Sequence, residues 1–307
     1  MTATADTPVT ETVDAPAAFL AARRPTQITT PGVHNISFDD YLRDPVPGGS
    51  LSNSEAKHLM PPRGIPARFR WEKDHKRPPK NTFDIGTAAH RMVLGVGPEL
   101  YVIDADNYRT ADAQAMRDDA RADGMVPLLA HEYEQILAMA TALREHPSAS
   151  VLFEPGSGLP EQTLVWRDKA TGVMRRARLD WLPVVGDGRL IIPDFKTCAS
   201  VDKHAISTAM NTFGYHTQAA TYLDGVRALD IHPEPAFLNV YQEKTPPYLV
   251  RIFEPDALAL LVARDLNKAA LELYAACDAA GHWPGYLNPE LVSLPAWVEN
   301  EYLRETS

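Results

Sequence analysis

The feature that most constrains the fold is a short apolar run that ends in charged residues, at 191–197. We expect a buried strand there, and because side chains alternate along a strand, Asp194 and Lys196 leave the same face about 7 Å apart. A second predicted strand ends at 178–181 and brings in another carboxylate, that of Asp180. Two carboxylates and an ammonium group at strand ends favour a divalent-metal site with a base or a charge stabiliser beside it. The alternative is a plain ion pair at a strand end.

The composition is that of an ordinary globular protein, with 45% hydrophobic and 23% charged residues in a chain of 307. No apolar run reaches the length of a membrane span, and the N-terminus lacks the basic region and apolar core of a secretory signal. Two cysteines are too few for a disulfide framework. We therefore expect a cytoplasmic protein without membrane contact. The net charge of −10 argues against nonspecific coating of nucleic acid but permits a local basic groove.

The chain is predicted to form a disordered tail over residues 1–30, rich in Thr, Ala, Pro and Asp, followed by a single domain over 31–307. Ser37 is expected to cap a first helix, and Ser52 with Glu55 forms a capping box for a second. Further helices are expected at 83–94, at 110–146 with Pro127 dividing two helices, at 205–226 and at 255–280.

Strand patterns fall in two groups. Segments 161–166, 173–181 and 190–197 read as three strands in meander order, with Asp187 and Gly188 as a hairpin turn. That order places Glu161 on one small sheet with the two carboxylates and the lysine described above. Two more strands are expected at 236–242 and 248–253.

Basic residues concentrate in two places. Between residues 63 and 80, basic side chains are interleaved with the aromatic residues Phe69 and Trp71. The basic residues of this segment are candidate DNA contacts: Arg63, Arg68, Arg70, Lys73, Lys76, Arg77 and Lys80. A solvated loop is an equal alternative for this segment. The second group, on the strand that leads to Asp180, is Arg175, Arg176 and Arg178, which could contact phosphate or pair with nearby acids.

Together, five ordered elements resemble a known family. They are Gly86-x-x-x-His90, Glu161, Asp180, the run Pro193-Asp194-Phe195-Lys196-Thr197, and Gly214-Tyr215-His216-Thr217-Gln218-x-x-x-Tyr222. The set is similar to RecE-type (exodeoxyribonuclease VIII-like) exonucleases of phages and prophages, in the PD-(D/E)XK superfamily. Lambda exonuclease and the RecB nuclease domain are relatives. The resemblance implies an α/β, restriction-endonuclease-like fold, in which helices flank a central mixed β-sheet and an N-terminal helical elaboration precedes it.

The resemblance also assigns roles to residues. Asp180 and Asp194 would share a Mg²⁺ ion, for which Mn²⁺ may substitute, with Glu161, His90 and the backbone carbonyl of Phe195 nearby. Lys196 would orient or deprotonate the attacking water, or neutralise developing charge, and the sequence leaves open which. Gln218 and Tyr222 would position Lys196 or the DNA backbone. His216 is left between helix packing and phosphate contact. No iron–sulfur cluster is expected, because two cysteines cannot hold one.

The activity that the resemblance implies is digestion of linear double-stranded DNA from its ends. Digestion would run 5′ to 3′ and leave 3′ single-stranded tails for a RecT-like annealing recombinase. A homo-oligomeric ring, a trimer or a tetramer, is expected, in the cytoplasm of a bacterial host. Two alternatives stay open: a structure-specific or restriction-type endonuclease of the same superfamily, and a non-catalytic protein that binds DNA ends.

Overall fold

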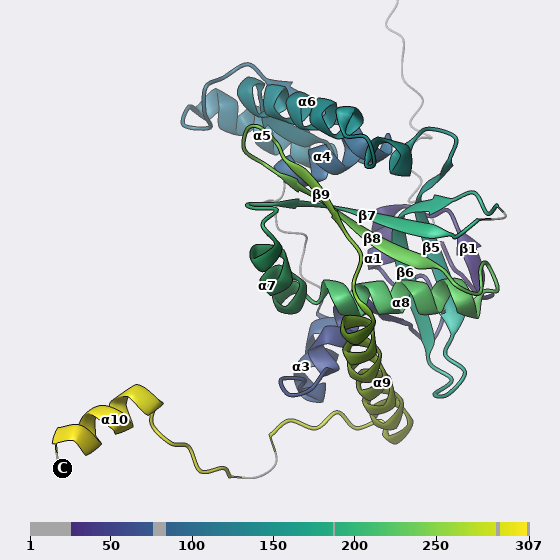
Figure 1. The fold of residues 1–307 in the computed structure, drawn as a ribbon, viewed down its shortest axis with the longest axis vertical. Coiled ribbons are helices and arrows are strands. Elements are labelled where there is room, and N and C mark those ends of the chain that lie inside the picture. The colour runs from purple at the N-terminus through teal and green to yellow at the C-terminus, as the bar shows by residue number, and fades with distance from the viewer. Residues whose placement is uncertain (1–25, 76–83, 187, 287–288, 306–307) are drawn as a thin grey trace, which may run out of the picture.

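A computed structural model of the chain describes residues 26–75, 84–186, 188–286 and 289–305 (Figure 1). Its elements in chain order are β1 (Gly32–His34), α1 (Phe38–Leu42), β2 (Leu51–Ser52), α2 (Asn53–Ala56), the 3₁₀ helix η2 (Lys57–Leu59), α3 (Pro66–Asp74), α4 (Asp84–Leu94), β3 (Leu100–Ile103), α5 (Ala111–Ala122), β4 (Val126–Leu129), α6 (Ala130–Glu145), the 3₁₀ helix η4 (Ser150–Phe153), β5 (Gly158–Arg167), β6 (Met174–Pro183), β7 (Ile191–Cys198), α7 (Lys203–Phe213), α8 (Tyr215–Ala228), β8 (Ala236–Glu243), β9 (Val250–Phe253), α9 (Ala257–Ala280) and α10 (Ala296–Glu305). Among the described residues, no helix combines the length and the apolar character needed to cross a bilayer.

The strands form a mixed β-structure at the centre of the molecule. One sheet has the order β1-β5-β6-β2, a second β7-β8-β9, and a third pairs β3 with β4. β5 and β6 are antiparallel, whereas β7 and β8 are parallel. β6 and β7 lie next to each other, and the backbone N–H of Phe195 in β7 donates to a carboxylate oxygen of Asp180 in β6 at 2.7 Å. This confirms the predicted α/β class with a central mixed sheet flanked by helices.

Helices cover both faces of these strands (Figure 1). α4 and α6 pack on one face through a buried cluster that includes Met139, Trp181 and Phe195. α8 packs on the other face through a cluster that includes Leu179 and Leu223. Each large apolar side chain buried in this way contributes about 1.5–3 kcal/mol. The two layers therefore fix β6 and β7, the strands that carry Asp180, Asp194 and Lys196.

The predicted meander of three strands is wrong in its last step. β7 pairs in parallel with β8, in a register that sets Asp194 beside Asn239, instead of continuing the antiparallel sheet of β5 and β6. Parallel neighbours need a long crossover, and α7 with α8 supplies it. The predicted hairpin turn includes residue 187, which lies outside the described residues.

Two predicted helical segments are divided in the structure. Pro127 separates α5 from α6, as predicted, but the residues between them form β4, a buried four-residue strand paired with β3, which was not expected. The helix expected at 205–226 is two helices, because Gly214 adopts a left-handed conformation (φ 67°) that ends α7 and begins α8. The two predicted N-terminal caps are confirmed: Ser37 caps α1, and Ser52 with Glu55 forms the capping box of α2.

The predicted disordered tail falls mostly on residues 1–25, outside the described residues. Its last part is ordered: Ile28 is buried, and its backbone N–H donates to the carbonyl of Pro45. Ile28 packs with Ile36, Val46 and Val165, so an apolar contact fixes this part of the chain against β5.

Candidate active site

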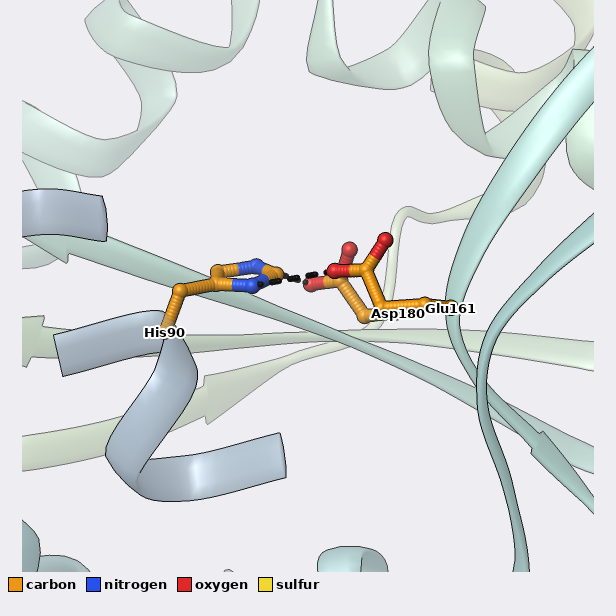
Figure 2. Close-up of side chains that lie close together, drawn as sticks. All are labelled: His90, Glu161 and Asp180. Atoms are coloured by element: carbon orange, nitrogen blue, oxygen red, sulfur yellow. Dashed lines mark hydrogen bonds and ion pairs between the residues drawn. The ribbon is translucent and has the colours of Figure 1, made fainter. Parts of the chain in front are cut away.

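Three side chains, from α4 and from the strands β5 and β6, meet in the structure (Figure 2). The pairs on either side, Pro160 with Trp181 and Gln162 with Leu179, set Glu161 opposite Asp180. His90 reaches both from α4. Its Nε2 lies 2.9 Å from Asp180 Oδ2, and its Nδ1 lies 3.4 Å from Glu161 Oε1.

Glu161 has a strained backbone inside a strand. Its φ of 55° lies in the left-handed region, which costs a non-glycine residue about 1–3 kcal/mol. The surroundings hold it there: Arg178 Nε donates to its carboxylate, and Arg178 Nη1 donates to the carbonyl of Ile36 at 2.9 Å. Backbone strain of this kind persists only where the surrounding structure holds the residue in place, and it is found most often at functional sites.

His90 and Asp180 stabilise each other's charged forms. Burial disfavours an imidazolium, but the Asp180 charge and hydrogen bonds to Asp180 and Glu161 outweigh it and raise the pKa of His90 to about 10. Burial alone would raise the pKa of Asp180, yet His90, Lys196 and the Phe195 N–H hold it below its ordinary value. Without a cation, His90 therefore carries a proton between two carboxylates at neutral pH.

A second group lies on β7 and α8. Asp194 is 1% exposed, and Lys196 Nζ lies 2.5 Å from its Oδ2, as expected for two side chains on one face of a strand. Gln218 Nε2 donates to Asp194 Oδ1 at 2.8 Å and to the hydroxyl of Tyr222 at 3.1 Å. The Gln218 amide therefore links Asp194 to a buried tyrosine.

The charge state of Lys196, which the sequence left open, follows from these neighbours. Burial would lower its pKa, but Asp194 and Asp180 raise it above the ordinary value. Burial raises the pKa of Asp194 to about 6. The charge of Asp180 also raises this pKa, whereas the charge of Lys196 lowers it. A raised pKa keeps Lys196 in its ammonium form at neutral pH, and this form can stabilise negative charge.

His90, Glu161 and Asp180 are the candidate metal ligands. Each offers one ligand atom, and these atoms lie within 4.8 Å of one another. An imidazole nitrogen and two carboxylate oxygens suit a divalent cation. Asp194 does not belong to this cluster, since its two oxygens contact Lys196 and Gln218. Its predicted sharing of a metal with Asp180, and the predicted role of the Phe195 carbonyl, stay predictions.

Two predicted DNA contacts on β6 are contradicted by burial. Arg175 is 2% exposed and lies over the ring of Trp166, and Arg176 is 3% exposed and pairs with Asp44 and Glu55 at 3.1 and 3.0 Å. Arg178, mostly buried, holds Glu161 instead of facing solvent. The sequence does not show which arginines on the two faces of a strand are buried, because acids that arrive from other segments can pair with them inside the protein.

The residues of the predicted basic segment 63–80 have different environments in the structure. Lys73 is mostly buried and pairs with Asp44 and Glu55, which argues against a DNA contact, and Arg70 pairs with Asp74 on the surface of α3. Arg63 and Arg68 are exposed. Lys76, Arg77 and Lys80 lie outside the described residues.

Two further residues near the site have roles that the sequence did not reveal. His216 is buried, and its Nδ1 contacts the carbonyl of Met210 at 3.0 Å, so it packs α8 against α7. Lys57 was not singled out from the sequence. It lies close enough to the site for the charges of Lys196 and Asp194 to shift its pKa. The one feature of the sequence that could have drawn attention to Lys57 is its position directly after α2, the helix that begins with the capping box.

Comparisons with known proteins agree with the fold. A family described as "PDDEXK-like domain of unknown function (DUF3799)" matches residues 66–289. The crystal structure of a candidate exonuclease from Eubacterium rectale has a similar fold, with a TM-score of 0.54 and 12% identity over 87% of this chain and 98% of that one. The crystal structure of SSO0001 gives a TM-score of 0.33 and 13% identity over 71% and 74%, too low for an argument. No curated protein matches the chain.

Proposed function

The chain belongs to the PDDEXK-like family that matches residues 66–289, and from this membership we propose that it is a metal-dependent deoxyribonuclease. The family and the fold support a nuclease, that is, a phosphodiester hydrolase. The observation that carries the proposal is that two groups lie on the adjacent strands β6 and β7: a candidate metal cluster, and an ammonium ion held beside a buried carboxylate.

Each group has a distinct task in this chemistry. His90, Glu161 and Asp180 would hold a Mg²⁺ ion, which when bound supplies positive charge beside the scissile phosphate. Lys196 adds a second positive charge that stabilises the negative charge developing on the phosphate oxygens. Asp194 and Gln218 keep the ammonium group in place, and Arg178 keeps Glu161 turned toward His90.

We further propose that the enzyme acts on the ends of linear duplex DNA, in the manner of RecE-type exonucleases. It would digest 5′ to 3′ and leave 3′ single-stranded tails for an annealing protein, with several copies forming a ring around the DNA. The sequence resemblance supports this choice over an endonuclease, and the fold shared with a candidate exonuclease agrees with it. Light scattering that finds only monomers at assay concentration would contradict the ring.

Linear and covalently closed circular duplexes of the same sequence test this function. With Mg²⁺ we expect the linear form to be degraded and the closed circle to survive. A label at the 5′ end should be released before a label at the 3′ end. The Lys196→Ala variant is the control for contaminating nucleases. Degradation of the closed circle as fast as the linear form would make the protein an endonuclease.

A further inference from the structure

The turn between α7 and α8 places an exposed aromatic surface next to the predicted catalytic lysine. The ring of Tyr215 lies 5.0 Å from Lys196 Nζ. The ring of Phe213 lies 5.6 Å from that of Tyr215, and 55% of Phe213 is exposed. Aromatic surface therefore runs outward from Lys196 to solvent, at the end of a helix that follows β7 directly (Figure 1).

A second lysine crosses the same turn. Lys57 Nζ donates a hydrogen bond to the backbone carbonyl of Phe213. Its side chain runs across Gly214, where an added Cβ would come within 2.8 Å of Lys57 Cε. Gly214 thus allows both the left-handed turn and the close approach of the lysine. This lysine comes from η2, far away in sequence, so the turn brings two independent segments together.

The electrostatics of this region suit a nucleic acid strand. The protein has a net charge of −10, yet no Asp or Glu occurs between Asp202 and Asp224, the stretch that forms α7 and the start of α8. Burial and the charge of Lys196, partly offset by Asp194, lower the pKa of Lys57 to about 8. Two lysines that repel each other gain from an anion between them, because it relieves the repulsion.

We propose that Phe213, Tyr215 and Lys57 form a nucleotide-binding subsite, in which an unpaired base stacks on Phe213 and the adjoining phosphate contacts Lys57. The inference rests on the proposed nuclease function, since it places this nucleotide next to the phosphodiester at Lys196. Every base has an aromatic face, so the subsite accepts any sequence. It requires the base to be unpaired, as at a frayed or opened end of a duplex.

The proposal predicts a coupling between one ring and one base. The probe is a single-stranded oligonucleotide, intact or with an abasic site moved through its three terminal positions, bound in Ca²⁺ so that binding is measured apart from cleavage. We expect Phe213→Ala to weaken binding of the intact strand by about 10-fold, the scale of one base stacked on an aromatic ring. With the abasic site at the contacted position, the wild type and Phe213→Ala should bind alike.

Matched variants separate stacking from other causes. Phe213→Tyr keeps a ring and should bind like the wild type. Trp297→Ala removes another exposed aromatic side chain, on a helix without buried residues, and should change nothing. Lys57→Gln should weaken binding of intact and abasic strands equally and reduce the salt dependence, because it removes a phosphate contact. Thermal unfolding of Phe213→Ala should match the wild type.

The outcomes distinguish this subsite from the function on which it rests. Equal binding of the intact strand by wild type and Phe213→Ala, or an equal loss on intact and abasic strands, overturns the subsite. Cleavage of linear duplex by the wild type in Mg²⁺ is measured alongside. If the wild type cleaves and the coupling is absent, only the subsite fails; if it does not cleave, the nuclease proposal fails whatever the coupling shows.

Discussion

The proton on His90 gives metal binding a pH dependence that can be worked out from the site. The pKa of His90 is raised to about 10, so at pH 7.5 only about 3 molecules in 1,000 carry a neutral imidazole. A cation that binds this nitrogen must displace the proton, at a cost of about 3 kcal/mol at that pH. Affinity should therefore tighten by about 10-fold for each pH unit between 7 and 9.

Isothermal titration calorimetry with Mg²⁺ or Ca²⁺ measures this directly. In buffers of different ionisation enthalpy, we expect the release of about one proton per bound ion at pH 7.5. His90→Gln keeps a side-chain oxygen that can ligate the metal but has no proton to lose. Its affinity should be nearly independent of pH in this window. A wild-type affinity that stays constant from pH 7 to 9, or an unchanged slope in His90→Gln, would refute the assignment of His90 as a ligand.

Three other perturbations follow from the same contacts. Lys196→Ala should abolish cleavage while leaving the fold and DNA binding largely intact; cleavage at the wild-type rate in a gel assay would contradict its assigned role. Arg176→Ala removes one of the two cationic partners of Asp44 and Glu55 and leaves them paired with Lys73 alone, which should cost about 1.5–3 kcal/mol in urea unfolding, and a loss below about 0.5 kcal/mol would contradict this. In EDTA, His90 stabilises the fold fully below about pH 6.5, and this contribution is lost as pH rises through about 10. The stability difference between wild type and His90→Gln should therefore shrink from pH 6.5 to 9.5, and a constant difference would argue against the raised pKa.

Local patterns predicted the strand that carries Asp194 and Lys196, because alternation along β7 is enough to bring these two side chains to the same face. The capping of α1 and α2 was likewise readable from a few neighbouring residues. The approach of His90 to Asp180 was different, since 90 positions separate them. In the sequence, only the resemblance to known nucleases links these two residues.

Features fixed by tertiary packing could not be predicted. β7 pairs with β8 because α7 and α8 carry the chain back across the sheet, and no local signal distinguishes that path from a hairpin. The burial of Arg176 depends on Asp44 and Glu55, which arrive from the N-terminal segment. The subsite residue Lys57 reaches the site because Gly214 leaves room for it, a contact between segments far apart in sequence.

The most direct test of the central claim is a crystal of the protein soaked in Mn²⁺, with data collected for anomalous scattering from manganese. The account predicts one strong peak bounded by the side chains of His90, Glu161 and Asp180. Asp180→Asn should lose that peak. A peak at another place in the protein, or the same peak undiminished in Asp180→Asn, would contradict the account.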